Sequence, residues 1–429
     1  MATSNVVIAG ATYPDVPAVM LNKSGGGTAT YTDVSDSTAV ATDVAQGKYF
    51  YTAQGVRTEG TASGGGSTPP TTPTDAVIFY ATKPFTLGTG NSAKNWNGTL
   101  YYSTNHSTWS EWNGTPIEAS QSGDYYVLYL RGSRNTYLNG ASGASSSAWW
   151  CGGATVMCCG NLNKLLSYTG TVTFADYAFA YLFFNAYNVD FDITLPQTLL
   201  TPHCYQGMFY NTSITKAPSL PATTMKTYCY ANMFYGCNGL KNAPSLPATT
   251  LDTYCYNSMF YYCKGLVTAP SLPATVTKAS CYYGMFSGCK SLTTAPSLSS
   301  VTTLTESCFY SMFQNCTSLT SAPALPVTTL AASCYGSMFY GCTSLSSIPA
   351  LPATTLANYC YQTMFRNCTN IKLSTTQTGA YQTAYRIPTS GTGTTATNAL
   401  NNMFTGTGGN FAGTPTINTT YYTSNTVIS

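Results

Sequence analysis

The sequence predicts a multidomain, β-rich protein: a small α/β module, a β-sandwich-like domain, and then a solenoid of stacked coils with a cap at each end. Two observations predict this order. A Met-Phe pair recurs at near-constant spacing through the second half of the chain, and short β-prone runs separated by Gly-containing turns precede it. The length of 429 residues also exceeds the usual span of one domain and favours two to four units.

The composition narrows the classes of function. Charged residues make up 7% of the chain and the formal net charge is +3, whereas an average soluble protein has about 25% charged residues. Nucleic-acid binding needs clustered Lys and Arg for phosphate contacts, so we expect no nucleic-acid partner. Thr, Ser, Asn, Gly and 35 Tyr must form the surface instead, a composition that favours recognition over catalysis. Because no run of about 18 apolar residues occurs, we also expect no membrane span.

Residues 1–62 form the first compositional block, which we predict to be the α/β module and to attach the chain to a partner. Thr42 suits a helix N-cap and Gly47 suits a C-cap. The residues that follow predict a hairpin that turns near Gln54-Gly55.

The next blocks are predicted to be a linker, a sandwich and a cap. Residues 63–74, SGGGSTPPTTPT, lack apolar side chains, which is typical of a linker. Residues 75–144 contain short β-prone runs between Asn-Gly and Ser-Gly turns, the pattern of a small antiparallel sandwich. Residues 145–180 are predicted to cap the solenoid. We expect three tryptophans, Trp96, Trp109 and Trp112, to pack in the sandwich. The alternative for the segment STWSEWNG is an aromatic site that binds a sugar.

The solenoid prediction rests on the spacing of the Met-Phe pairs. Successive pairs lie 25–27 residues apart, and Leu182-Phe183 occupies the same position one period before the first. A constant period in this range indicates coils that bury their apolar faces only by stacking. We assign residues 181–372 to the solenoid and residues 373–429 to a C-terminal cap. The seven methionines are Met208, Met233, Met259, Met285, Met312, Met338 and Met364.

One coil illustrates the expected local structure. Cys229, Met233 and Cys237 are spaced by four residues, which on a helix places them on one stripe, so we predict a short helix or helical turn with a buried face. Pro244 and Pro247 remove two backbone donors, so we predict one short parallel strand per coil, interrupted by proline.

The repeat also places cysteines in two columns, which we predict to be structural packing. Free cysteine is a small, commonly buried hydrophobe. No Cys-x2-Cys pair exists and the chain has two His, so we predict no metal site and no cofactor; His203 beside Cys204 gives no clear nucleophile, and we predict no catalytic residue. The first residues resemble no secretory signal, so we expect reduced thiols, with disulfides as the alternative. The columns are Cys229, Cys255, Cys281, Cys308, Cys334 and Cys360, and Cys237, Cys263, Cys289, Cys316, Cys342 and Cys368.

Two further columns are mostly aromatic. The residue after the first cysteine of each coil is Tyr or Phe, and helical geometry predicts that this column, from Tyr205 to Tyr361, covers the edge of the buried stripe. A variable column contains Ser287 and Gln314 as well as Tyr, so packing does not demand Tyr there. We take its larger members as the candidate ligand-binding face: Tyr210, Tyr235, Tyr261, Tyr340 and Arg366.

The coil motif CYxxMFxxCxxLxxAPxLPATTL resembles the BspA-type leucine-rich repeat of bacterial surface proteins. The resemblance covers about residues 175–405, and Phe-x-x-Cys-x-x-Leu recurs in six coils from Cys237 to Cys368, the last with Ile371. The additional first cysteine and APSLP in place of a β-branched strand depart from that pattern. Residues 41–62 are similar to a module at the start of bacteriophage structural proteins, and LYLRGSRN (128–135) resembles the sandwich before such repeats in gut-bacterium and phage adhesins.

These resemblances imply a non-enzymatic bacteriophage fibre or decoration protein on the virion surface, made in the host cytoplasm. Residues 1–62 would contact other virion proteins, and the solenoid would bind a host-surface glycan or protein. The alternative is a bacterial cell-surface adhesin. An enzyme is the third class, but Asp190 and Asp192 in NVDFDI suit one strand face and indicate no cleft. A homo-oligomer is possible, although no heptad or collagen repeat demands one.

Overall fold

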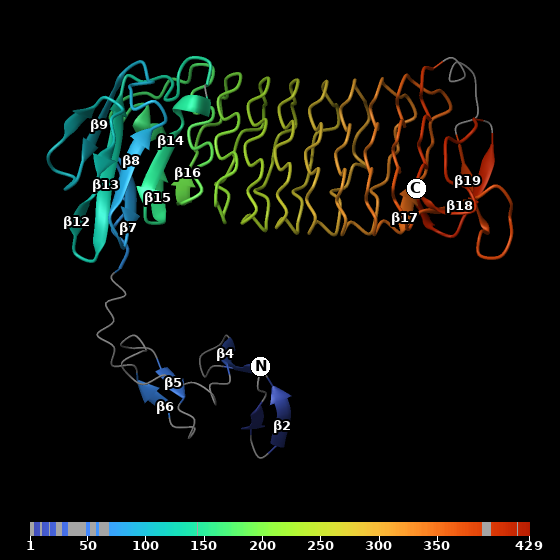
Figure 1. The fold of residues 1–429 in the computed structure, drawn as a ribbon, viewed down its shortest axis with the longest axis horizontal. Coiled ribbons are helices and arrows are strands. Elements are labelled where there is room, and N and C mark those ends of the chain that lie inside the picture. The colour runs from blue at the N-terminus through green and yellow to red at the C-terminus, as the bar shows by residue number, and fades with distance from the viewer. Residues whose placement is uncertain are drawn as a thin grey trace. The chain divides into compact units, whose positions relative to one another are not determined.

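The computed structural model describes residues 68–429 apart from 144, 388–395 and 418, and the backbone of six strands before residue 68 (Figure 1). The chain divides into two compact units, Met1–Pro70 and Thr71–Ser429. In the first unit the strands form three antiparallel pairs: β1 (Ser4–Ile8) with β2 (Ala11–Val16), β3 (Ala18–Asn22) with β4 (Thr28–Thr32), and β5 (Tyr49–Tyr51) with β6 (Arg57–Glu59). The β5–β6 pair brackets the predicted hairpin turn, whereas the turn itself and the predicted helix lie outside the described residues.

The second unit begins with two packed sheets. The larger has the order β10-β9-β13-β7-β15-β16 with β12 paired to β13, and the smaller has the order β11-β8-β14. All neighbours are antiparallel except β15 and β16, which are parallel. The strands are β7 (Val77–Ala81), β8 (Phe85–Thr89), β9 (Thr99–Ser103), β10 (Ser110–Trp112), β11 (Ile117–Glu118), β12 (Ser120–Ser122), β13 (Tyr125–Ser133), β14 (Trp149–Gly153), β15 (Val156–Asn161) and β16 (Val189–Thr194).

These sheets extend past residue 144, where the sequence suggested that the sandwich ends. The apolar runs of β14 and β15, which fall in the range assigned to the solenoid cap, complete the two sheets. Trp149 on β14 contacts Trp96 and Trp112 with ring centroids 6.5 and 5.2 Å apart. Because these rings fill the space between the sheets, the residues of the predicted cap and those of the predicted sandwich share one core.

The coils are built from ribbons of consecutive turns, so the predicted helix is wrong. Within one ribbon, Met233 N donates to Tyr230 O (3.2 Å) three residues back, and the next amide, Phe234 N, donates to Met259 O (2.9 Å) in the following coil. Every fourth residue has positive φ: Tyr228 at 54°, Asn232 at 55° and Gly236 at 71°. Helix formation would require every amide to bond within the coil, whereas here alternate amides bond between coils. Among the described residues the helical elements are two 3₁₀ turns, η2 (Ser145–Ser147) and η3 (Leu162–Leu165).

The proline-containing part of each coil is extended but forms little sheet. The predicted strand is reduced in most coils to isolated parallel bridges such as Thr224–Thr250 and Asn242–Thr268. Proline has no N–H to donate to a ladder, so pairing stops where the Ala-Pro and Leu-Pro steps occur. A regular strand, β17 (Ser347–Pro349), forms near the C-terminal end.

A small sheet and the C-terminal strand close the last coils. The sheet has the order β19-β21-β18-β20, and β22 pairs in parallel with β17. Asn425, just before β22, bridges two coils by donating to Ser346 O and Asn370 O, both at 2.9 Å. The strands are β18 (Lys372–Ser374), β19 (Thr383–Arg386), β20 (Gly408–Gly409), β21 (Thr420–Thr423) and β22 (Thr426–Ile428).

One hydrophobic cluster runs from Val77 in the sheets to Tyr421 in the C-terminal sheet. The repeated phenylalanines, from Phe183 to Phe404, stack through it with ring centroids 5.4–6.1 Å apart. The column from Tyr205 to Tyr361 stacks beside them at 0–2% exposure. The prediction that this column lies at the edge of the core is wrong. In a ribbon with four residues per turn, two adjacent side chains of each turn point inward.

Candidate functional site

The outer side of the turn ribbons carries a continuous group of partly exposed aromatic residues on the first coils. We call this group the aromatic face. It contains two stacked columns and three further tyrosines beside them. The first column is Tyr177, His203, Tyr228 and Tyr254; the second is Phe184, Tyr210, Tyr235 and Tyr261; the additional residues are Tyr262, Tyr283 and Tyr310.

The rings of the aromatic face lie parallel to one another from coil to coil. Tyr210 and Tyr235 have centroids 4.2 Å apart at an interplanar angle of 6°, and Tyr235 and Tyr261 follow at 4.9 Å and 14°. In the other column, Tyr228 and Tyr254 are 4.5 Å apart at 4°. The spacing of adjacent extended chains, about 4.8 Å, sets this distance. Since the rings within a column cover one another's faces, the columns present mainly ring edges and hydroxyl groups to solvent.

Glycines accommodate the rings of the preceding coil. Gly288 has φ of +76°, and a Cβ added to it would lie 2.5 Å from Cδ1 of Tyr262. Gly207 likewise lies directly beneath the ring of Tyr181. The Tyr262 ring therefore lies in a place that a larger residue would occupy, and 40% of Tyr262 remains exposed.

Four tyrosines of the aromatic face, Tyr228, Tyr235, Tyr261 and Tyr283, have a pKa above the ordinary value for tyrosine, mainly because of burial. Burial, with the hydrogen bond and charge of Tyr210, raises the pKa of Tyr235 to about 12. Burial raises the pKa of Tyr283 too, and the nearby hydroxyls of Tyr310, Tyr261 and Tyr254 raise it further. At neutral pH these hydroxyls keep their protons and can donate hydrogen bonds.

The structure brings together three of the five predicted face residues. Tyr210, Tyr235 and Tyr261 form one stack. Tyr340 and Arg366 lie farther along the same column, beyond Ser287 and Gln314, where the Arg366 guanidinium lies 5.8 Å from the Tyr340 ring centroid. The column that begins at Tyr177 was missed, although the residue before the first cysteine of each coil was a visible signal.

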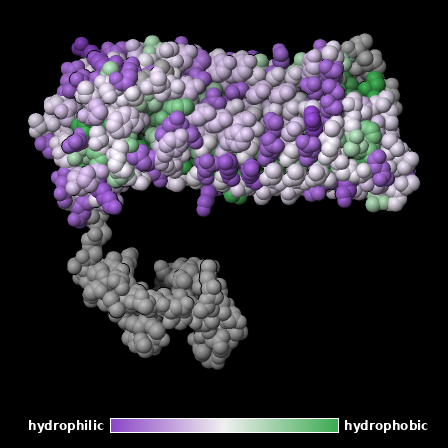
Figure 2. Space-filling view, in the orientation of Figure 1, coloured by the Kyte–Doolittle hydropathy of each residue, from purple (hydrophilic) through white to green (hydrophobic). Residues whose placement is uncertain are grey.

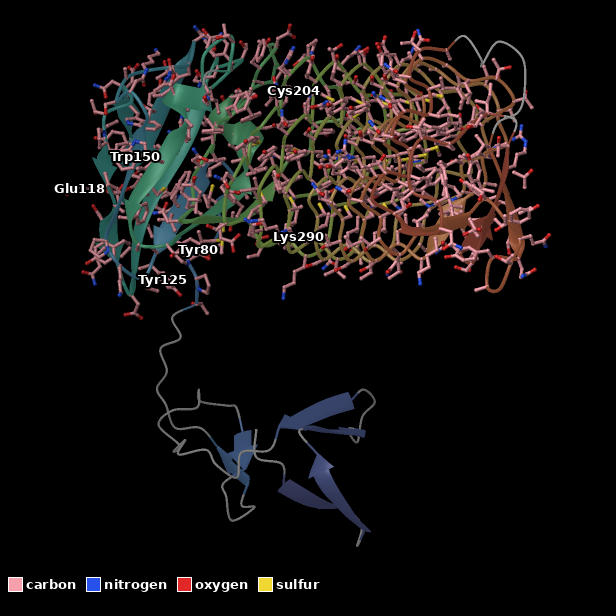
Figure 3. All side chains as sticks on the ribbon, turned by 45° about the vertical axis from the view of Figure 1, so that its right-hand side comes forward. Tyr80, Glu118, Tyr125, Trp150, Cys204 and Lys290 are labelled. Atoms are coloured by element: carbon pink, nitrogen blue, oxygen red, sulfur yellow. The ribbon has the colours of Figure 1, made fainter. Side chains whose placement is uncertain are left out.

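The twelve predicted column cysteines all lie in the interior at 0% exposure, and the sulfur atoms follow the inside of the coils (Figure 3). All sixteen cysteines fall in the described part of the chain, and each is a free thiol. In the second column every Sγ donates to the carbonyl oxygen of the phenylalanine one coil earlier, at 2.8–3.1 Å. Thr212 and Thr407 occupy the ends of this column and make the corresponding bonds within their own coils, to Phe209 O and Phe404 O.

No nucleophile is formed by the His203-Cys204 pair. Burial raises the pKa of the Cys204 thiol to about 12, and Cys204 is fully buried. His203 Nδ1 pairs with Gln206 Oε1 at 2.7 Å, and its ring is stacked between Tyr177 and Tyr228. The imidazole of His203 therefore makes its contacts on the outer side of the ribbon, whereas the thiol of Cys204 faces the core.

The carboxylates of NVDFDI have local partners. Asp190 accepts bonds from the backbone N and Oγ1 of Thr215, and Asp192 forms an ion pair with Lys216 at 3.2 Å. Within the described ranges no cluster of three or more His, Cys, Asp or Glu is arranged to hold a metal ion. In the same ranges no helix is long and apolar enough to cross a membrane.

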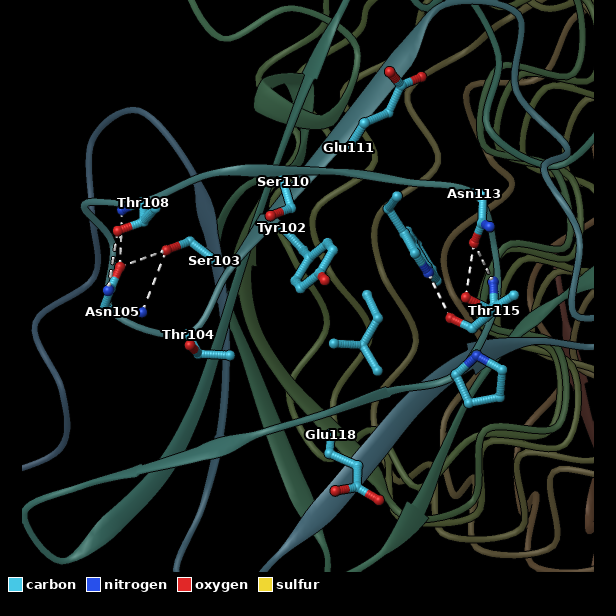
Figure 4. A pocket seen from close by; sticks show the side chains of 13 residues that line it. Tyr102, Ser103, Thr104, Asn105, Thr108, Ser110, Glu111, Asn113, Thr115 and Glu118 are labelled. Carbon is cyan, nitrogen blue, oxygen red and sulfur yellow. Dashed lines mark hydrogen bonds between the residues drawn. The ribbon is translucent and has the colours of Figure 1, made fainter.

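A polar groove of about 620 Å³ lies between the sheet edges at β10 and β11 (Figure 4). Trp112, in its wall, is 1% exposed and donates from Nε1 to Thr115 O at 2.7 Å, so it belongs to the core. The Arg131 guanidinium lies over the ring of Trp109, 3.9 Å from the ring centroid. Glu111 and Glu118 line opposite sides of the groove, and both are exposed.

Comparison with known proteins gives one family and one solved structure. Residues 155–283, 202–335 and 310–387 match the family model described as BspA type leucine rich repeat region, with six copies. The crystal structure of a leucine-rich repeat protein from Bacteroides ovatus is similar at 21% identity and a TM-score of 0.28, over 47% of this chain and 57% of that one. The chain thus spans little more than half the length of that protein. No curated protein matches the chain.

Proposed function

Because the chain belongs to the BspA-type leucine-rich repeat family, we propose that it is a non-enzymatic, adhesin-type protein that binds a cell-surface glycan or protein through the aromatic face. One observation carries the proposal. In the two columns of the ribbon, the first four coils hold aromatic residues throughout, whereas the next coils hold Ser280, Ser287, Ser307, Gln314 and Ser333, and tyrosine returns at Tyr340 and Tyr359. The core phenylalanines of the coils with small polar residues still stack at 5.7–5.8 Å, so the stacking of coils does not by itself require the tyrosines.

The chemistry of the aromatic face suits recognition. Tyrosine offers a rigid, amphipathic contact at low entropic cost, with an apolar ring and a hydroxyl that donates or accepts. On this face the rings are further fixed by stacking, so little side-chain freedom is left to lose on binding. A surface of ring edges and hydroxyls fits a hydroxyl-rich ligand.

Catalysis has little support in the described residues. A glycosidase needs two carboxylates across a cleft, with its general acid in a desolvated environment. Glu111 and Glu118 in the groove are both exposed. The fully buried thiols cannot reach a substrate.

Mutation of the aromatic face tests the proposal. We expect that replacing Tyr210, Tyr235 and Tyr261 together by Ser, the residue found at position 287, abolishes binding of the full chain to an array of bacterial surface polysaccharides and to intact cells. Tyr340→Ser, in the same column but outside the face, is the matched control and should bind normally. Unchanged binding by the triple variant, with an unchanged melting temperature, would refute the assignment.

We propose a bacteriophage virion as the site of display, with residues 1–62 in contact with other virion proteins. The resemblance of residues 41–62 to a phage module supports this, as does the separation of Met1–Pro70 as its own unit. A bacterial cell surface is the second candidate, which the family match favours. Mass spectrometry of purified virions and of washed producer cells distinguishes the two, since the chain should be found in one preparation and not in the other.

A further inference from the structure

Lysines gather on the same coils as the aromatic face. Residues 195–372 contain eight Lys or Arg and two Asp or Glu. Six of the eight are lysines between residues 203 and 292, where one acidic residue, Asp252, is present. All six are exposed: Lys216, Lys226, Lys241, Lys264, Lys278 and Lys290.

Most of these ammonium groups lack a counter-charge in the protein. Among the described residues, Lys216 alone of the six forms an ion pair, with Asp192, and both side chains are largely exposed at 79% and 69%. Asp252 accepts a bond from Thr253 N at 2.7 Å and pairs with no lysine. A charge that serves only solubility requires no particular place, whereas these charges concentrate on the coils that carry the tyrosines.

Two of the lysines lie two residues along the chain from the contact between Tyr262 and Gly288. Lys264 follows Tyr262 by two residues, and Lys290 follows Gly288, on which the Tyr262 ring packs. Lys264 N donates to Asn238 Oδ1 in the previous coil, so Asn238, Lys264 and Lys290 occupy equivalent places on successive coils. Lys290 lies at the lower edge of the coils in Figure 3, and Figure 2 shows hydrophilic side chains along that edge.

We propose that the aromatic face and the adjoining lysines bind an acidic glycan, a polysaccharide that carries carboxylate or sulfate groups. This deepens the proposed function and rests on it. The edge of an aromatic ring carries partial positive charge, and the stacked tyrosines present edges and O–H donors outward. Donation to an anionic oxygen is stronger than donation to a neutral one. Ring edges, hydroxyls and unpaired ammonium groups therefore all favour an anionic ligand.

The stacking also argues for a glycan over a nucleic acid. Single-stranded nucleic acids bind by laying bases on free aromatic faces, but here neighbouring rings cover those faces at 4.2–4.9 Å. Sugar hydroxyls and carboxylates need only the ring edges and the Tyr oxygens.

Binding of the full chain to polygalacturonate, to its carboxyl-reduced form, to chondroitin sulfate and to single-stranded DNA tests this. We expect binding to one or both acidic polysaccharides, weakening as salt screens the charges, and none to the reduced polymer. The double variant Lys264→Gln/Lys290→Gln should weaken that binding by about fivefold, as exposed charge pairs do. Lys164→Gln, in the sheet region, is the control and should change nothing.

The outcomes separate the two proposals. Equal binding to the charged and reduced polymers, insensitivity to salt, or equal binding to DNA overturns the acidic glycan while leaving a tyrosine-dependent adhesin intact. Tyrosine-dependent binding to cells with no affinity for either acidic polymer also overturns it. If binding to cells and polysaccharides does not depend on Tyr210, Tyr235 and Tyr261, the proposed function itself is overturned.

Discussion

The thiol of Cys263 donates a hydrogen bond of 2.9 Å to the carbonyl oxygen of Phe234 in the coil before it. The same bond recurs from Cys237 to Cys368, and Thr stands at both ends of the column. The second cysteine column therefore acts as both packing and a donor ladder between coils. Cysteine and threonine share what this position needs, a small side chain with one donor.

Replacing Cys263 separates packing from donation. Cys263→Ala removes the sulfur and its hydrogen bond, and we expect a loss of about 1–2 kcal/mol in the free energy of unfolding. Cys263→Thr keeps a donor of similar size and should lose less. Urea denaturation followed by circular dichroism measures both, and equal losses would mean that the bond contributes nothing.

Gly288→Ala should destabilise the protein by about 1–2 kcal/mol and displace the Tyr262 ring, because the residue has positive φ and the new Cβ would meet the ring. Gly123→Ala is the matched control, since Gly123 has φ of +61° and nothing within 4 Å. The difference between the two losses measures the ring contact. A smaller loss at Gly288 than at Gly123 contradicts the role given to Tyr262.

Asn425 should hold the C-terminal strand in place. Its side chain bonds Ser346 O, Asn370 O and Lys372 N, so we expect Asn425→Ala to cost about 2–4 kcal/mol and to expose β17 and β22 to hydrogen exchange. Asn410→Ala, at an exposed side chain in the same region, should leave exchange unchanged. If β17 and β22 are equally protected from hydrogen exchange in both variants, the C-terminal strand is held by its backbone hydrogen bonds alone.

Alkali should unfold the coils. Burial raises the pKa of the Cys237 thiol from 9.0 to about 11, and that of Cys308 likewise. The folded state then holds these protons more tightly than the unfolded state, so their contribution is complete below about pH 9 and declines as pH rises toward the folded value. Urea midpoints measured from pH 7 to 11 should fall above pH 9, while a thiol reagent should find the native thiols unreactive at pH 8. Urea midpoints that rise from pH 7 to 11 would contradict a raised pKa of these buried thiols.

Much of the coil interior could be predicted from spacing alone. The Met-Phe period indicates which residues repeat, and the structure places those residues in stacked columns at the core. Local geometry could not be derived in the same way, because residues four apart share a face both on a helix and on a ribbon of four-residue turns. Asn211, Gly236 and Gly288, which tolerate positive φ, were a signal for turns. Tyr228 and Tyr254 also have positive φ, at 54° and 56°, and such bulky residues conceal the pattern.

The candidate site was partly predictable for a related reason. A variable column is visible in a single sequence, so Tyr210, Tyr235 and Tyr261 could be grouped. Tyr340 and Arg366 share the column but not the stack, because Ser287 and Gln314 lie between them and Tyr261. The boundary at residue 144 was similarly beyond the sequence, since β14 and β15 pair with β8 and β7 across long separations.

The alternation of amides along each ribbon has a consequence for how such proteins change length. Along each turn ribbon, alternate amides donate within the coil and the amides between them donate to the same backbone positions of the next coil, so gain or loss of one whole repeat leaves the backbone bonding of the ribbons on either side unchanged. Unequal recombination between near-copies could thus lengthen or shorten the array in whole coils. Each such event would alter the number of tyrosines and lysines offered to a partner while the two ends, which are not repeated, stay the same.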